Sequence, residues 1–156
     1  MSTLIFAHVL TGLAGIASGL ISTVGMFYRR RMAYWNPVFL SATAAACATG
    51  FVFLPTDGVT SAQLVAFFVV SLLTLAVYAR YVRRLDGSWN QVYAFTAVGA
   101  LFLNVLITTA QSFLHVRALK DLAPTQHSPV YVAAKFSLLL LFIVVAIVAA
   151  KRSGRS

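Results

Sequence analysis

The sequence has few acidic residues and lacks most of the side chains that carry catalytic or covalent chemistry. Its 156 residues include no glutamate, one cysteine and three aspartates. A lone cysteine, Cys47, excludes an intrachain disulfide. Asp57 and Asp86 each precede a glycine in a predicted turn, and Asp121 lies in a connection between apolar stretches. No pair of carboxylates is placed for acid–base catalysis, so the sequence favours a protein that is not an enzyme.

Motifs that identify common enzyme classes are also missing from the sequence. It contains no glycine-rich phosphate loop, no His-Glu-x-x-His zinc helix and no Gly-x-Ser-x-Gly nucleophile elbow. No acidic residue lies within an apolar stretch to bind a proton or a sodium ion. Ion-coupled transport is therefore weakly supported, although a small oligomeric transporter stays open as a function.

Long apolar runs dominate the rest of the sequence. Hydrophobic residues make up 60% of the chain and charged residues 10%, whereas soluble domains average about 25% charged residues. A helix that crosses the hydrocarbon layer needs about 20 mainly apolar residues. Five stretches meet that need, at residues 4–28, 37–54, 62–81, 89–113 and 130–150. The sequence predicts an all-α integral membrane bundle with five transmembrane helices, in one domain covering residues 1–156.

The positive charge predicts orientation rather than nucleic-acid binding. The chain has 12 basic residues and a net charge of +9, but these residues flank apolar stretches instead of forming one face of a soluble domain. With five crossings, nine of them fall on one side: Arg29, Arg30, Arg31, Arg80, Arg83, Arg84, Lys151, Arg152 and Arg155. Arg117, Lys120 and Lys135 fall on the other side. The positive-inside rule then places the N-terminus outside and the C-terminus in the cytoplasm.

Small residues on the first two stretches predict close helix packing. Gly12, Gly15 and Gly19 share one helical face of the first stretch, and His8 lies on the same face near its outer end. The second stretch carries small residues at the same kind of spacing, namely Ala42, Ala46 and Gly50. Small residues let helix backbones approach in a membrane. These positions predict bundle packing, with an oligomer seam as the alternative.

A polar stripe marks the outer half of the fourth stretch. Asn104, Thr108, Gln111 and His115 recur every three or four residues, which places them on one helical face. Such a stripe would be costly in lipid, so it is expected to face protein or a wet cavity. His8 and Lys135 are predicted at the same outer half, with Lys135 able to extend its amine outward. Together these six residues predict an outward-facing polar pocket between the first, fourth and fifth spans.

Several uses of this stripe remain open. Interhelical hydrogen bonding is the structural alternative. A lipid-like or quinone-like headgroup could be held by Gln111, His115 and Lys135. A membrane redox protein could bind haem b or quinone through His8 and His115. A three-histidine metal site would also need His127, and no Cys or Glu at recognised zinc spacing supports it.

The longest connection between the apolar stretches, residues 114–129, is rich in polar residues and contains two prolines. It holds Pro124, Thr125, Gln126 and His127, and a second proline follows at Pro129. Two prolines argue against a continuous helix, although residues 116–122 could form a short interfacial helix. This loop is the predicted contact for a membrane-protein partner.

The fourth stretch and this loop also carry a resemblance to a known family. Trp89, Tyr93, Asn104, Gln111 and Phe113, followed by Leu119 and Leu122-Ala-Pro-Thr-Gln126, resemble a family of small uncharacterised polytopic bacterial inner-membrane proteins. The likeness extends to Gly50 and Phe51. It implies a multi-pass protein of the bacterial inner membrane, and carries over no cofactor or catalytic residue. The first stretch is also loosely similar to the start of membrane proteins suspected of haem or electron-transfer roles.

These patterns together predict an accessory or binding protein. Its expected partners are membrane lipids, a membrane protein or further copies of the chain, and nucleic acid is not among them. The expected ligand is lipid-like or quinone-like.

Overall fold

The computed structural model describes residues 3–28, 34–52 and 61–154, and every regular element in these residues is helical. The elements are α1 (Thr3–Phe27), α2 (Trp35–Val52), α3 (Ser61–Val77), η1 (Tyr78–Val82), α4 (Trp89–His115), α5 (Arg117–Leu122) and α6 (Pro129–Ser153). The prediction of an all-α fold is confirmed. The short helix expected at residues 116–122 is α5. The predicted turn at residues 55–58 lies outside the described residues, as do Arg29, Arg30, Arg31 and Arg155.

Four helices of the described chain are long and apolar enough to cross a membrane: Thr3–Phe27, Leu64–Val82, Trp89–His115 and Pro129–Ser153. Helix α2, the second expected span, is not one of them. It has 18 residues, starts with Trp-Asn-Pro and contains five alanines. The described part of the bundle therefore has four helices that meet the length and composition of a membrane span.

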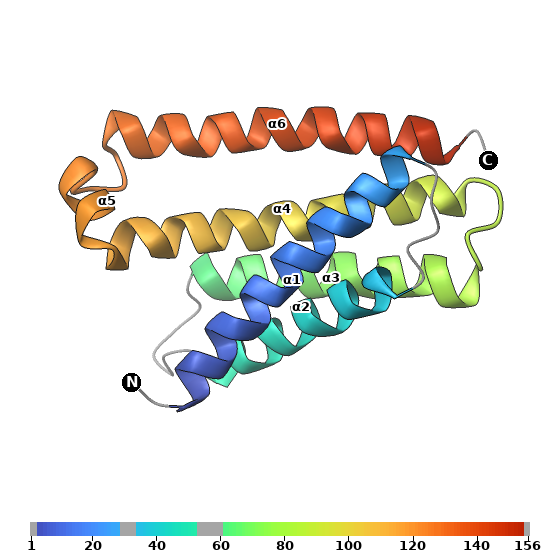
Figure 1. Ribbon diagram of the computed structural model, residues 1–156, viewed down its shortest axis with the longest axis horizontal. Helices are drawn as coiled ribbons and strands as arrows, with labels where there is room; N and C mark the ends of the chain where they lie inside the picture. The colour runs from blue at the N-terminus through green and yellow to red at the C-terminus, as the bar shows by residue number, and fades with distance from the viewer. Residues whose placement is uncertain (1–2, 29–33, 53–60, 155–156) are drawn as a thin grey trace.

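Helix α4 lies in the middle of the bundle (Figure 1). It packs against α3 on one side and α6 on the other, while α1 packs along α2 and crosses α4. Small residues on α4 allow this close packing, because Ala94, Ala97 and Ala100 are all buried. The five long helices run in alternating directions, and α5 closes the end between α4 and α6 (Figure 1).

The outward faces of the helices are apolar. Large hydrophobic side chains are exposed along α3 and α6, including Phe67, Phe68, Phe136 and Leu140. Monomeric soluble proteins rarely expose so continuous an apolar surface. In a bilayer these side chains would contact lipid tails, so the exposure agrees with membrane-length helices.

The chain reverses between α3 and α4 through an irregular turn. The π-helical turn η1 widens the end of α3, so that the Arg83 N–H donates to the Tyr78 carbonyl at 3.0 Å. Arg84 and Leu85 then adopt left-handed φ values of 52° and 62°, which non-glycine residues rarely do. Gly87 at φ 54° completes the turn. These residues bring α4 back against α3 within a few positions.

Candidate functional site

The interface between α1 and α2 holds the first predicted site residue. His8 Nδ1 lies 2.9 Å from Thr49 Oγ1. The His8 ring also lies against Gly50, where a Cβ would be 3.2 Å from His8 Cε1. Two of the predicted positions, His8 and Gly50, therefore meet each other across α1 and α2.

Three helices meet at the predicted packing glycines. A Cβ on Gly15 of α1 would lie 2.9 Å from Thr43 Oγ1 of α2 and 3.1 Å from Asn104 Nδ2 of α4. One turn further along α1, a Cβ on Gly19 would lie 2.7 Å from a Leu101 methyl and 2.8 Å from the Phe39 ring. Real Cβ atoms almost never make contacts this short. Helix α1 can therefore cross α4 at Gly15 and Gly19 because these residues have no side chain.

The other predicted packing residues lie in varied surroundings. Ala46 is buried and Ala42 is half-buried on α2. Gly12 differs from Gly15 and Gly19, because no atom of the described chain lies within 4 Å of the place where its Cβ would be. The close approach of α1 to its neighbours is thus confined to part of its glycine face.

The three-helix junction leaves polar atoms without hydrogen bonds. Thr43 is only 1% exposed, and neither its Oγ1 nor the buried Asn104 Nδ2 has a hydrogen-bond partner within the described residues. Buried polar atoms normally have a partner because leaving one unsatisfied costs about 1–3 kcal/mol. Asn104 Nδ2 therefore lies against protein, and within the described residues it donates no interhelical hydrogen bond.

The rest of the polar stripe on α4 lies in a different environment. Thr108 is half-buried, whereas Gln111 and His115 are exposed. His115 Nδ1 lies 3.0 Å from the Gln111 carbonyl oxygen of the same helix. Helix α1 crosses α4 obliquely (Figure 1), and its close approach to the stripe is at Asn104, opposite Gly15.

Lys135 of α6 lies near the same end of the bundle. It is exposed, and its Nζ lies 5.3 Å from the centre of the Tyr131 ring. Tyr131 is one turn closer to the N-terminus of α6, so the amine extends toward that end of the helix. Such an arrangement is typical of a lysine that carries its charge out of an apolar layer.

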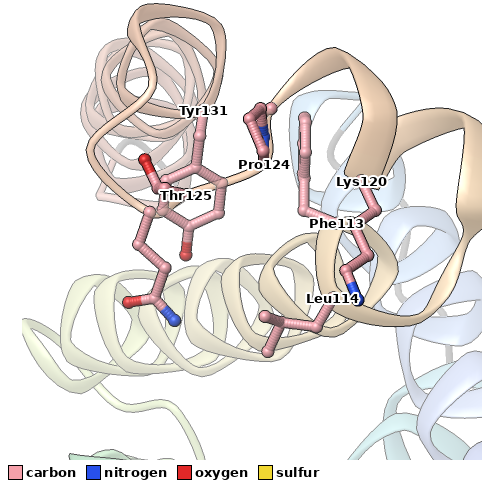
Figure 2. Close-up of a pocket in the computed structure, with 8 residues that line it drawn as sticks. Phe113, Leu114, Lys120, Pro124, Thr125 and Tyr131 are labelled. Carbon is pink, nitrogen blue, oxygen red and sulfur yellow. The ribbon is translucent and has the colours of Figure 1, made fainter.

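A hollow lies where α4, α5 and the following loop meet α6, and we call it the α4–α6 hollow. Figure 2 shows Phe113 of α4 and Tyr131 of α6 with Pro124 of the loop between them in this view. The two rings pack edge to face at 5.3 Å. The hollow is lined by Phe113, Leu114, Lys120, Ala123, Pro124, Thr125, Gln126 and Tyr131.

The α4–α6 hollow is small. Its volume is about 30 Å³, which exceeds the roughly 10–15 Å³ that one water molecule needs. Sites that enclose a whole drug-sized ligand start at about 300 Å³. The hollow can therefore take a small polar group, while the remainder of any larger ligand would lie outside it.

The loop that forms one wall of the hollow is held in place by local contacts. The Thr125 N–H donates to Ser128 Oγ at 3.2 Å, and the two hydroxyl groups also lie 3.2 Å apart. Ala123 is buried, at 5% exposure, and Pro129 begins α6 at a position where a missing N–H costs nothing. Of the predicted loop residues, Pro124, Thr125 and Gln126 line the hollow, and His127 is exposed beside it.

A metal ion could be bound by a cluster of histidine, cysteine and carboxylate side chains. Within the described part of the chain, no three such side chains lie close enough together to hold a metal ion. His8 contacts Thr49 on α2, and His115 contacts the backbone of its own helix. Haem ligation by these two histidines stays a prediction.

Comparison of the chain with known protein families, curated proteins and solved structures finds no match. The resemblance drawn from the Leu-Ala-Pro-Thr-Gln loop therefore stays a prediction. The site has to be interpreted from its own geometry and chemistry.

Of the eight residues that line the hollow, five were not among the predicted site residues. Phe113 and Tyr131 flank the longest connection on either side, and Lys120 lies within it. Aromatic residues at the two ends of a connection are typical of the membrane interface, so this signal could have identified the pair. The position of α5, which brings Lys120 into the same hollow as Phe113, cannot be read from the sequence.

Proposed function

We propose that the protein is a five-span integral membrane protein of the bacterial inner membrane, with its N-terminus outside and its C-terminus in the cytoplasm. The alternating directions of the five long helices support this topology (Figure 1). The distribution of nine basic residues against three supports the orientation. Helix α2 would then cross as the second span, shielded from lipid along its contact with α1.

Within that topology, the protein is a non-catalytic binding protein for a lipid-like or quinone-like ligand, and the α4–α6 hollow is its site. The observation that carries this proposal is the mixed lining of the hollow. Phe113, Leu114 and Tyr131 supply apolar and aromatic surface at the end of the apolar helices. Lys120, Thr125 and Gln126 supply hydrogen-bond donors at the same place.

This combination suits an amphipathic ligand that bears a hydrogen-bond acceptor. An ammonium, a hydroxyl and an amide can each donate to a carbonyl or phosphoryl oxygen, and hydrogen bonds to charged groups are the stronger ones. The small volume admits the polar head alone. The apolar tail would then lie along exposed side chains of α6 such as Val130 and Phe136, in the lipid layer.

The test is a titration of the full-length protein in neutral detergent with decylubiquinone and, separately, with lysophosphatidylcholine. Binding is followed by the fluorescence of the protein. We expect saturable binding of at least one of these probes. The variant Lys120→Gln with Gln126→Ala should bind it about tenfold more weakly, because it loses a charged hydrogen bond worth about 1.5–3 kcal/mol.

Lys151→Gln is the matched control, because this lysine lies on α6 at the opposite end of the bundle and its removal also costs one positive charge. It should bind like the wild type. Equal affinity of wild type and the double variant for both probes would contradict the proposal, as would the absence of saturable binding of either probe.

A further inference from the structure

Five basic side chains gather at the end of the bundle opposite the α4–α6 hollow, and we call this the basic end. Arg80 lies in η1, and Arg83 and Arg84 follow it in the turn before α4. Lys151 and Arg152 lie in the last turn of α6. Asp86 supplies the only carboxylate at this end among the described residues. Five positive charges thus stand against one negative charge.

Contacts between helices join the two groups of basic residues. Asn90 Nδ2 at the start of α4 donates to the Ser153 carbonyl at the end of α6, at 2.7 Å. Arg152 Nη1 donates to the Phe27 carbonyl at the end of α1, at 2.6 Å. The ends of α1, α4 and α6 therefore meet here, and η1 packs against α4, so the basic side chains of η1 and α6 lie at the same end of the bundle.

Two of the arginines are held against aromatic rings. The Arg83 guanidinium carbon lies 5.0 Å from the centre of the Trp89 ring, and that of Arg80 lies 5.6 Å from the centre of the Tyr93 ring. A cation over an aromatic ring is attracted to the ring, which limits the movement of its side chain. Arg83 and Arg80 are thus held at the turn, and the exposed Arg83 can donate to a partner.

The turn between α3 and α4 produces this arrangement. The extra residue of η1 and the left-handed Arg84 and Leu85 set the positions of Arg83 and Trp89, which are close across the turn. Tyr78 of η1 also packs against Trp89, with ring centres 5.3 Å apart. Left-handed conformations at non-glycine residues are costly and often mark functional segments.

We propose that the basic end binds the phosphate headgroup of an anionic phospholipid. Planar guanidinium groups match phosphate oxygens in pairs, and basic pockets between membrane helices are a recognised setting for anionic lipid headgroups. Exposed apolar side chains border the cluster, among them Tyr81, Val82 and Ile147. The acyl chains would lie against these side chains while the phosphate contacts Arg83 and Arg152.

The experiment measures the thermal unfolding of the full-length protein in a neutral detergent while a ligand is added. The ligands are phosphatidylglycerol, phosphatidylcholine, inorganic phosphate and a DNA duplex, each in a separate titration. A ligand that binds the folded state stabilises it. We expect phosphatidylglycerol to raise the unfolding temperature in a saturable way and by more than phosphatidylcholine or inorganic phosphate does.

The variant Arg83→Gln with Arg152→Gln should weaken phosphatidylglycerol binding at least about tenfold, since each basic residue near an anionic surface contributes to attraction. The matched control is Arg117→Gln with Lys135→Gln, which removes two charges from the opposite end and should bind like the wild type. If far-ultraviolet circular dichroism shows that the first variant is unfolded, the exposed turn position Arg84→Gln replaces it and should weaken binding as well.

Four results would overturn the inference. These are wild-type binding by the basic-end variant, an equal loss in the control, equal stabilisation by phosphatidylcholine or inorganic phosphate, and saturable stabilisation by the DNA duplex. The inference is independent of the proposed function, because neither Arg83 nor Arg152 lines the α4–α6 hollow.

Discussion

The side-chain nitrogen of Asn104 lies 3.1 Å from the point that a Cβ on Gly15 would occupy. Asn104 belongs to the central helix α4 and Gly15 to α1, so the α1 backbone comes nearly into contact with a side chain of α4. The hydroxyl oxygen of Thr43 on α2 lies 2.9 Å from the same Cβ position. The junction of these three helices therefore depends on the absence of a side chain at Gly15, and the same reasoning applies to Gly19 one turn away.

Replacing Gly19 by alanine should destabilise the bundle. The new methyl group would lie 2.7 Å from Leu101 and 2.8 Å from Phe39, and both of these side chains are buried at 1% exposure. Overpacking of a filled core typically costs about 1–3 kcal/mol. Unfolding in mixed detergent micelles measures the loss.

Gly12→Ala is the control for this prediction. It lies on the same helix with no described atom within 4 Å of the new methyl group. Its stability should stay the same or rise by up to about 1 kcal/mol, because alanine favours a helix over glycine. If Gly12→Ala and Gly19→Ala lower the free energy of unfolding equally, the effect would come from the conformation of α1 and not from packing against Leu101 and Phe39.

Replacing Thr43 by valine should leave stability unchanged or raise it by about 1 kcal/mol, because the buried hydroxyl has no hydrogen-bond partner in the described residues and valine has the same shape. Thr49→Val on the same helix should instead destabilise by about 0.5–1 kcal/mol, because its hydroxyl contacts His8. The same unfolding assay compares the two. A loss at Thr43 as large as that at Thr49 would mean that the Thr43 hydroxyl has a polar partner.

The positions of the helices could be predicted from the sequence to within a few residues. Long apolar runs set where a helix can lie, and prolines and turn residues set where it ends. The expected stretch at 89–113 is α4, Trp89–His115, and the expected stretch at 130–150 is α6, Pro129–Ser153. The expected stretch at 62–81 covers nearly all of α3 and most of η1, but the π-helical form of η1 was not predicted, because a single extra residue in a helix leaves no periodic signal.

The candidate site was harder to predict because helix periodicity gives a face and not a crossing angle. Asn104, Gln111 and His115 do share a face of α4, but α1 covers the Nδ2 atom of the half-buried Asn104, while Gln111 and His115 are exposed. His8 shares its face with the glycines of α1 and contacts α2 at Thr49. Small residues such as Gly15 decide which helix packs against a given face. Their effect depends on the side chains of the partner helix, which periodicity in one helix does not reveal.

Cysteine labelling tests whether α2 crosses the membrane. In a Cys47→Ala background, single cysteines replace Arg30 before α2 and Thr56 after it. If α2 crosses as proposed, a membrane-impermeant maleimide should label position 56 in intact cells and position 30 only after permeabilisation. Labelling of both positions from the same side would show that α2 does not cross.

An absorption spectrum tests the redox alternative. The binding function proposed for the α4–α6 hollow involves no haem, so the protein purified in detergent should show no Soret band. Should a Soret band appear, and disappear in both His8→Ala and His115→Ala, haem ligation by these histidines would replace the proposed function. A band that survives both substitutions would point to a different ligand pair.

The most direct test of the account is photo-crosslinking at the α4–α6 hollow. A quinone or a lipid with a photoreactive group in its head is irradiated with the full-length protein, and labelled peptides are mapped by mass spectrometry. We predict saturable labelling within residues 113–131 that unlabelled ligand displaces and that Lys120→Gln with Gln126→Ala removes. Labelling spread along α3 and α6 without displacement, as bulk lipid would give, contradicts a binding site at this hollow.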